Sequence, residues 1–272
     1  MLYWDIFMNA KIGLGYLPSL HHEVEILRGL IDFWEVLPEG FFGGRLPQYL
    51  DELSSVMTIF HGTQLDLLGT SGCRSRYINE LAKIASVCNP DLITDHMALM
   101  SFEQMSCELY IPPKYNKYWV DHAISRINYL STKINLPTSK LAFENIPDYI
   151  NHDNDISEGE FFHQIWKATG VGTIINVNSL IMSSIFTGKS IVHIIDGYHP
   201  SSVVSVTYVP INEMNQEIVK QVSGDITKLL SNTLFELKNK LCPSKILIQR
   251  RFPKNRFHYI ENEINFVKEI ML

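Results

Sequence analysis

Short apolar runs alternate with longer amphipathic stretches along most of the chain. An apolar run of a few residues bounded by turn formers is typical of a buried parallel strand, whereas apolar residues three or four positions apart indicate a helix. The runs predict strands near residues 10–14, 31–36, 56–60, 91–95, 140–144, 173–177, 202–208 and 244–249. No linker or low-complexity segment divides the chain, so we predict a single domain over residues 1–272.

The stretches between these strands predict helices. The clearest is amphipathic, with Val120, Ile124 and Ile127 near one face. Helices are expected near residues 19–30, 46–53, 74–87, 118–134, 157–169, 185–195, 215–240 and 259–270. Ser157 and Glu160 have the spacing of a capping box. The segment between residue 96 and the prolines at 112 and 113 is expected to be a long loop.

Regular alternation of strands and helices predicts an α/β fold, a (β/α)₈ barrel of the TIM type. The length of 272 residues suits one such barrel, and a hydrophobic content of 46% is enough for a sizeable core. The net charge of −6, without a basic cluster beyond Arg250 and Arg251, argues against nucleic-acid binding. No apolar run approaches about 18 residues and no signal peptide is evident, so we expect a cytoplasmic protein that binds no membrane.

Polar side chains stand at the ends of most of the predicted strands. In barrels of this type the carboxyl ends of the strands meet at one mouth, where catalytic groups lie. The residues expected there are Glu35, His61, His96, Glu144, Asn176, Asn178, Thr207 and Gln249. Glu39, in the glycine-rich loop that follows the second strand, is expected to anchor that loop or to support the site.

His61, His96 and Glu144 suggest a metal centre. Two imidazoles and one carboxylate form a set that leaves positions open on iron, and zinc with three protein ligands and a water is the alternative. Any one of these residues alone is more often a hydrogen-bonded polar residue at a strand end. All three at equivalent places on three strands favour a metal site.

Six short motifs occur in the order found in a known family. They are Ile12-Gly-Leu-Gly-Tyr-Leu-Pro18, Asp32-Phe-Trp-Glu-Val-Leu-Pro-Glu39, His61-Gly62, Thr94-Asp-His96, Phe143-Glu-Asn145 and Asn176-Val-Asn178. The chain thereby resembles, over about residues 10–250, the multinuclear non-haem iron-dependent oxidative enzymes, which include the oxidase of methanobactin biosynthesis. The resemblance implies iron, a ribosomally made precursor peptide whose cysteine or other residues are modified, and a small partner protein that delivers this peptide.

The resemblance also bears on single residues. His61, His96 and Glu144 match metal ligands of the family. Asn176 and Gln249 stand where the family has acids, and Thr187 and Thr207 where it has histidines. Amides keep the shape of carboxylates but lose the negative charge that offsets repulsion between several metal ions. The sequence therefore supports one iron ion rather than a full cluster.

Two functions of different classes remain open. The first is a non-haem iron oxidative enzyme with a reduced metal site, acting on a peptide. The second is a catalytically inactive barrel that binds a peptide or a partner. The replaced acids favour the second, and the retained His61, His96 and Glu144 favour the first. A zinc hydrolase or a sugar isomerase of similar shape is less favoured, because the six motifs point elsewhere.

Overall fold

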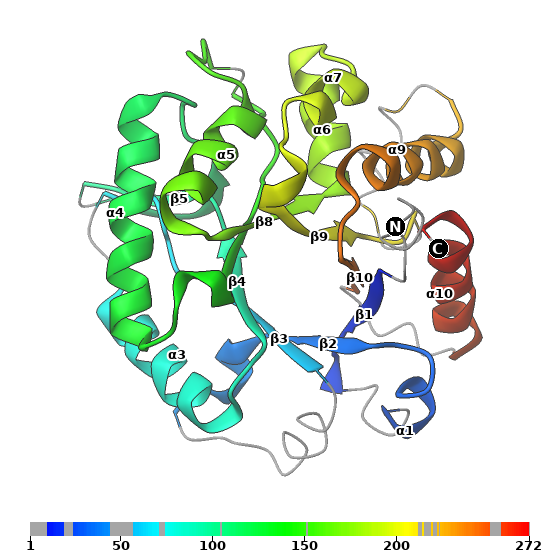
Figure 1. The fold of residues 1–272 in the computed structure, drawn as a ribbon, viewed down its shortest axis with the longest axis horizontal. Coiled ribbons are helices and arrows are strands. Elements are labelled where there is room, and N and C mark those ends of the chain that lie inside the picture. Colours follow the sequence, from blue (N-terminus) through cyan, green and yellow to red (C-terminus); the bar gives the residue numbers. More distant parts are fainter. Residues whose placement is uncertain are drawn as a thin grey trace, which may run out of the picture.

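The described residues form a closed barrel of eight parallel strands, seen in Figure 1 with its helices around it. A computed structural model describes residues 10–18, 24–43, 57–70, 74–103, 105–150, 152–211, 214, 219, 222, 224–250 and 257–271. The barrel strands are β1 (Lys11–Gly15), β2 (Phe33–Val36), β3 (Met57–His61), β4 (Leu92–His96), β7 (Leu141–Glu144), β8 (Gly172–Asn176), β9 (Val203–Tyr208) and β10 (Lys245–Ile248). They follow one another around the ring in chain order, and β10 closes it against β1. The predicted barrel is confirmed.

Helices cover the outside of this ring. They are α1 (Val24–Leu27), α3 (Ser75–Cys88), α4 (Lys117–Ile134), α5 (Glu158–Thr169), α6 (Val177–Thr187), α7 (Ile191–Asp196), α9 (Ile226–Leu241) and α10 (Phe257–Met271). Short 3₁₀ turns lie at η3 (Pro38–Phe41), η4 (Thr138–Lys140) and η5 (Pro200–Ser202). The helix predicted at 46–53 lies outside the described residues. No described helix is long and apolar enough to cross a membrane.

Two predicted helices have different boundaries. The segment expected at 185–195 is divided, because Gly188 ends α6 with a φ of +70° and Ser190 caps α7. Within the predicted helix 215–240, α9 begins at Ile226, where Asp225 Oδ1 accepts hydrogen bonds from the amides of Thr227 and Lys228, and most of residues 215–223 lie outside the described residues.

Only the serine half of the predicted capping box is confirmed. The amide of Glu160 donates to Ser157 Oγ at 3.1 Å, which caps α5. The Glu160 carboxylate instead accepts from Gln164 Nε2 at 2.8 Å.

The predicted long loop after residue 96 is wrong. It contains an antiparallel hairpin of β5 (Leu99–Phe102) and β6 (Met105–Ile111). The Asp66 carboxylate holds β5, because its Oδ1 accepts from the amides of Met100 and Ser101 at 2.6 and 3.1 Å. Figure 1 shows β5 outside the ring, on the side of α4.

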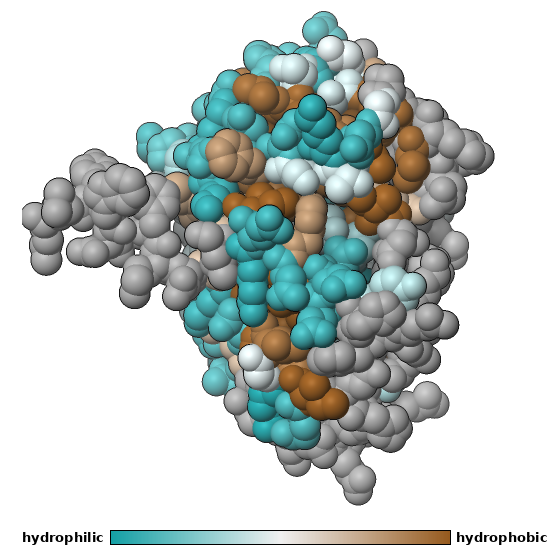
Figure 2. All heavy atoms as spheres, turned by 90° about the vertical axis from the view of Figure 1, so that its right-hand side faces the viewer, coloured by the Kyte–Doolittle hydropathy of each residue, from teal (hydrophilic) through white to brown (hydrophobic). Residues whose placement is uncertain are grey.

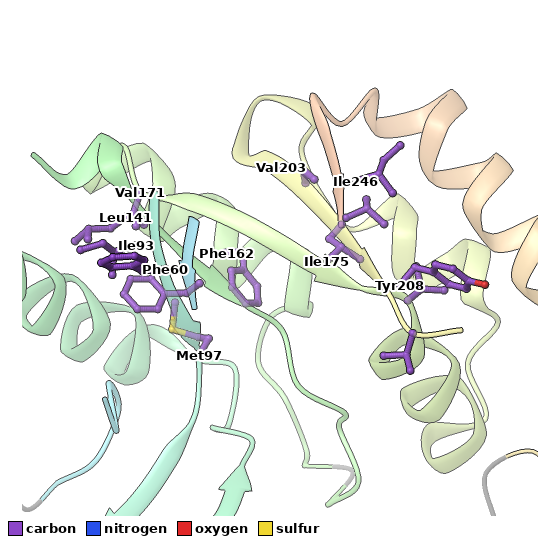
Figure 3. Packing of buried hydrophobic residues seen from close by; sticks show 14 of the residues in the cluster. Phe60, Ile93, Met97, Leu141, Phe162, Val171, Ile175, Val203, Tyr208 and Ile246 are labelled. Atoms are coloured by element: carbon purple, nitrogen blue, oxygen red, sulfur yellow. The ribbon is translucent and has the colours of Figure 1, made fainter. Parts of the chain in front are cut away.

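Apolar side chains fill both faces of the barrel wall. Figure 3 shows Phe60, Ile93 and Leu141, from three adjacent strands, on the outer face, where they belong to the main core beneath the helices. A smaller inner cluster comprises Phe33, Ile59, Leu92, Ala142, Ile174 and Leu247. On the outer surface, the face that bears α9 and α10 carries both polar and apolar side chains (Figure 2).

The alternation of inward and outward side chains along each strand determines which residues face the mouth of the barrel. Phe33, Ile59 and Ala142 face inward in the middle of the barrel, so residues two positions further along each strand also face inward, nearer the carboxyl ends. Those positions are Glu35, His61 and Glu144. At the opposite end, Asp32 and Asp91 accept hydrogen bonds from the amides of Ile12 and Thr58, which ties neighbouring strands together away from the site.

Candidate metal and peptide site

A cavity of about 620 Å³ opens at the carboxyl ends of the strands. Its wall includes most of the strand-end residues predicted from the sequence: Glu35, His61, His96, Glu144, Asn176, Asn178 and Gln249. Thr207 is buried on β9 and does not belong to this wall. The three proposed metal ligands thus face one space.

Strand register explains why the three proposed ligands face the same cavity. His96 on β4 pairs with Glu144 on β7, and His61 on β3 pairs with Thr94, two residues before His96. Residues two apart on a strand point to the same side. His61, His96 and Glu144 therefore occupy adjacent inward positions at two neighbouring levels.

The His61 ring is buried and held by Thr94. His61 Nδ1 lies 2.9 Å from Thr94 Oγ1, which itself donates to the carbonyl of Phe60 at 3.2 Å. A hydroxyl that donates to Phe60 accepts from His61, so this network assigns the His61 proton to Nδ1 and leaves a lone pair on Nε2. Burial, and then the neighbouring His96, lower the pKa of His61, which favours the neutral ring that binds metals.

His96 is positioned by two neighbours. Asp95 Oδ1 accepts from the His96 amide at 2.6 Å and lies 3.4 Å from its Nδ1. Tyr110 of β6 stacks on the His96 ring, with centroids 3.9 Å apart and planes 19° apart. The His61 and His96 rings are in edge contact, with centroids 4.9 Å apart.

Gly62 is required beside this pair. A Cβ on Gly62 would lie 2.4 Å from the Tyr77 hydroxyl and 2.7 Å from Asp95 Oδ2. Only a residue without a side chain lets Asp95 approach so closely. The His61-Gly62 motif thus serves the packing around Asp95.

Glu144 is oriented by an amide. Asn176 Nδ2 donates to Glu144 Oε1 at 2.7 Å, and Asn176 Oδ1 accepts from the Ser179 amide at the start of α6. Strand β8 passes directly into α6 at this residue, so Asn176 caps the helix and fixes Glu144 together. An ionised aspartate at 176 would cap the helix equally well but would repel Glu144.

Glu35 and Gln249 form a second pair on the wall. Burial raises the pKa of Glu35 well above its usual value, and the charge of Glu144 raises it further, against a hydrogen bond from Gln249 that lowers it. The balance favours a neutral Glu35 carboxyl. Its Oε2 lies 3.9 Å from His61 Nδ1.

Other predicted residues serve the scaffold. Glu39 Oε1 accepts from the Thr63 amide at 2.6 Å and from the Tyr77 hydroxyl at 2.7 Å, so it anchors its loop outside the cavity wall. Asn178 Oδ1 accepts from the Val209 amide and ties α6 to the end of β9. Thr187 lies at the far end of α6, bonded to the Ser183 carbonyl, and is not part of the wall.

The donors suit a metal in kind but are not gathered on one point. Two imidazoles and a carboxylate, on three adjacent strands, are the donors that iron or zinc accepts. Within the described part of the chain, however, no three His, Cys, Asp or Glu side chains form a group that could hold an ion. Ligation by His61, His96 and Glu144 therefore stays a prediction that requires these side chains to draw together.

Tyr110 is a site residue that the sequence interpretation missed. It lines the cavity and covers His96, from a segment that was expected to be a loop. The alternation of Met105, Cys107, Leu109 and Ile111 with polar or aromatic residues is the signal that could have revealed strand β6 and hence an inward Tyr110.

Sequence comparison identifies the family. Residues 11–271 match a family model described as RiPP precursor modification enzyme MbnB/TglH/ChrH. The chain belongs to this family. RiPPs are ribosomally made peptides that are modified after translation. The resemblance inferred from the six motifs is confirmed at the level of the family.

Similar proteins carry the family name UPF0276. One from Psychromonas ingrahamii is 24% identical over 158 residues, which cover 57% of this chain and 55% of that protein. One from Streptomyces avermitilis is 23% identical over 254 residues, which cover 89% of this chain and 51% of that protein. The chain thus spans about half the length of these curated relatives. One from Chromobacterium violaceum is 20% identical and covers 87% of this chain and 86% of that protein.

Solved structures share the fold. Endonuclease IV from Thermus thermophilus superposes with a TM-score of 0.57 at 9% identity and covers 95% of this chain and 99% of that one. An L-ribulose 3-epimerase superposes with a TM-score of 0.57 at 8% identity, covering 94% and 86%. At such low identity these similarities establish the barrel and nothing about activity.

Proposed function

We propose that this protein is an iron-dependent oxidative enzyme that modifies a residue, with cysteine as the target, of a ribosomally made precursor peptide. One observation carries the proposal: His61, His96 and Glu144 face the same cavity of about 620 Å³ at the active end of the barrel. Such a volume suits a peptide side chain with its backbone neighbours. Membership of a family of RiPP precursor modification enzymes supports the substrate class.

A single iron ion would be held by His61, His96 and Glu144. When bound, iron supplies the redox chemistry with oxygen that oxidation of a thiol needs, and a set of three protein ligands leaves room for the substrate. Zinc is the alternative metal and would favour hydrolysis. The role of Asn176 is to hold Glu144 Oε1 toward the cavity.

The other cavity residues prepare the space for chemistry. Thr94 keeps the proton of His61 on Nδ1, away from the lone pair that a metal needs. Burial raises the pKa of Glu35, which lies beside Gln249, so its carboxyl could supply a proton to a group that becomes negative during the reaction. Tyr110 covers one face of His96 and limits the access of water there.

Co-expression tests the activity directly. The chain is produced together with short cysteine-containing peptides encoded beside its gene and with any small partner protein encoded there, and peptide masses are measured. We expect a mass change that requires iron in the medium and disappears in His61→Ala. His193→Ala, an exposed histidine away from the cavity, should retain it. A mass change that persists in His61→Ala would refute the assignment of the site.

Two observations favour a second function. Asn176 and Gln249 place amides where an anionic cluster would have acids, and the three donors are not gathered. These features suit a barrel that binds a precursor peptide or a partner without altering it. In that case the peptide binds with unchanged mass, with or without iron.

A further inference from the structure

The hairpin β5–β6 presents an apolar face to solvent. Phe102 and Met105 pair across its two strands and therefore share a face, and Leu109 follows on the same face of β6 at even spacing from Met105. Their exposed fractions are 52% for Phe102, 69% for Met105 and 68% for Leu109. Exposing three large apolar side chains together to water is unfavourable, so such a row indicates a contact surface.

The other face of the hairpin is the one that contacts the barrel. Tyr110 stacks there on His96, and the Ser101 hydroxyl donates to the Asp66 carboxylate. At these positions the hairpin turns Ser101 and Tyr110 toward the protein and Phe102, Met105 and Leu109 away from it, although Leu99 and Met100 of β5 are buried. The exposed apolar side chains make this outward face suited to contact something else.

The apolar surface continues to the rim of the cavity. The Tyr149 hydroxyl donates to the Tyr110 carbonyl at 2.7 Å, which brings the segment after β7 against β6. Tyr149 and Ile150 are 40% and 44% exposed, and Pro147, two residues before Tyr149, lines the cavity. We call Phe102, Met105, Leu109, Tyr149 and Ile150 the hairpin patch.

We propose that the hairpin patch binds an extended, apolar segment of the peptide substrate that lies next to the residue in the cavity. This inference rests on the proposed function, because it takes the occupant of the cavity to be part of a peptide. A chain that leaves the cavity past Pro147 reaches Tyr149 and then the outward face of β6. An extended peptide advances about 3.3 Å per residue, so a few residues suffice to cover the patch.

The size of the patch favours a peptide over a protein. A large apolar side chain presents on the order of 200 Å² when fully exposed, so the exposed parts of the five side chains add up to about 500 Å². Patches of this size on single proteins are often functional, whereas a stable protein interface buries about 800 Å² on each partner. The five side chains of the patch are aliphatic or aromatic, so they would recognise apolar side chains of a ligand.

Alternation gives this recognition a definite form. An extended peptide points every second side chain to the same side, so a segment in which apolar and small polar residues alternate would lay its apolar side chains on the patch. The stacked Tyr110–His96 pair lies directly behind strand β6. A peptide held on the patch is thereby positioned against the wall of the cavity.

Fluorescence anisotropy with the full chain, freed of metal by a chelator, tests the proposal. The probe is a labelled ten-residue peptide in which leucine and valine alternate with serine and threonine. A second peptide with glutamine at the apolar positions is the control probe. We expect saturable binding of the first peptide, and at least a tenfold loss of affinity in Met105→Glu with Leu109→Glu. The anisotropy measurement needs neither iron nor turnover. The docking proposal can therefore be refuted while the proposed function holds, and the proposed function can be refuted while peptide docking is observed.

Matched variants separate the patch from general stickiness. Ile26→Glu with Val87→Glu removes two side chains of similar exposure, 60% and 66%, from α1 and α3, and should leave the affinity unchanged. If Met105→Glu with Leu109→Glu does not fold, as judged by circular dichroism, the milder Leu109→Ser and Phe102→Gln should each weaken binding several-fold. Absent binding, equal binding of both probes, or equal loss in both variant pairs would overturn the proposal. So would a dimer of the unmodified chain, seen by sedimentation, that the patch variant dissociates, since the occupant would then be a second copy.

Discussion

His61 depends on one hydroxyl. Thr94 Oγ1 accepts a hydrogen bond from His61 Nδ1 within a buried network. No other described residue offers an acceptor at hydrogen-bond distance from this nitrogen, since Glu35 Oε2 is 3.9 Å away. Substitution of Thr94 by valine keeps the shape of the side chain and removes this acceptor. The ring would then be free to choose the other tautomer or to turn.

We therefore expect two effects of Thr94→Val. The free energy of unfolding should fall by about 1–2 kcal/mol, the cost of leaving a buried hydrogen-bonding group unsatisfied. The affinity for Fe²⁺ should fall by roughly tenfold or more, as for other partners of metal-binding histidines. Chemical denaturation and metal titration measure the two, with Thr132→Val on the exposed face of α4 as control. Unchanged metal affinity would show that Thr94 does not orient His61.

Glu158 predicts a dependence of stability on pH. Its carboxylate accepts from Asn145 Nδ2 at 3.0 Å and from the Tyr198 hydroxyl, with Tyr115 and Asp148 close by. Burial raises the pKa of Glu158 from 4.5 to about 7, against the hydrogen bonds, which lower it. The folded protein therefore keeps a proton here that the unfolded chain releases at lower pH.

The sign follows from this difference. The stabilising contribution of Glu158 is complete below pH 4.5 and is lost as the pH rises to about 7, by up to roughly 3 kcal/mol. Glu158→Gln should make the free energy of unfolding less dependent on pH across this window, and Glu261→Gln, at an exposed position, should not. Denaturant titrations at several pH values check it. Parallel curves for the unmodified chain and Glu158→Gln would contradict the expectation.

At the scale of the elements, β1 and β2 have side chains of complementary size inside the barrel. A Cβ on Gly13 would lie only 2.0 Å from the Phe33 ring, so the glycine makes room for the ring within the inner cluster. Gly13→Ala should lower the free energy of unfolding by about 1–3 kcal/mol through overpacking. Adding Phe33→Leu to Gly13→Ala should restore part of this loss. If the double variant is no more stable than the sum of the two single changes predicts, the two residues are not complementary in this way.

Some strands and helices were predictable from the sequence and others were not. Strands such as β3 and β7 were evident because buried parallel strands read as apolar runs, and their register then placed His61 and Glu144 at one mouth. The hairpin departs from the alternation of one strand with one helix that defines a (β/α)₈ barrel, so only the spacing of Met105, Cys107, Leu109 and Ile111 indicated it. The start of α6 was missed because Asn176 ends a strand and caps a helix at once, without an intervening turn.

Most of the polar residues at the mouth were predictable, but their arrangement was not. His61, His96 and Gln249 line the cavity as their strand-end positions predicted, whereas Thr207 does not and Tyr110 was missed. Their bonding partners come from other strands and from the hairpin, as with Thr94 for His61 and Tyr110 for His96. Such pairs depend on register and side-chain rotamers, which no local pattern specifies.

For the whole molecule, charge limits how many ions the cavity can hold. Two unit charges 4 Å apart repel by about 4 kcal/mol at an effective dielectric constant of 20, so each further cation needs anions to offset it. Asn176 and Gln249 are neutral and line the cavity beside Glu144. We therefore propose one divalent ion, held by His61, His96 and Glu144, rather than a cluster of several.

The metal content of protein made with ample iron and purified without oxygen tests this claim most directly. We predict about one equivalent of iron in the unmodified chain, none in Glu144→Ala, and more than one when Asn176→Asp and Gln249→Glu restore two anions beside Glu144. Glu261→Ala, at an exposed position, is the matched control and should keep its iron. Two or more equivalents in the unmodified chain, or iron that survives in Glu144→Ala, would contradict the single-ion site.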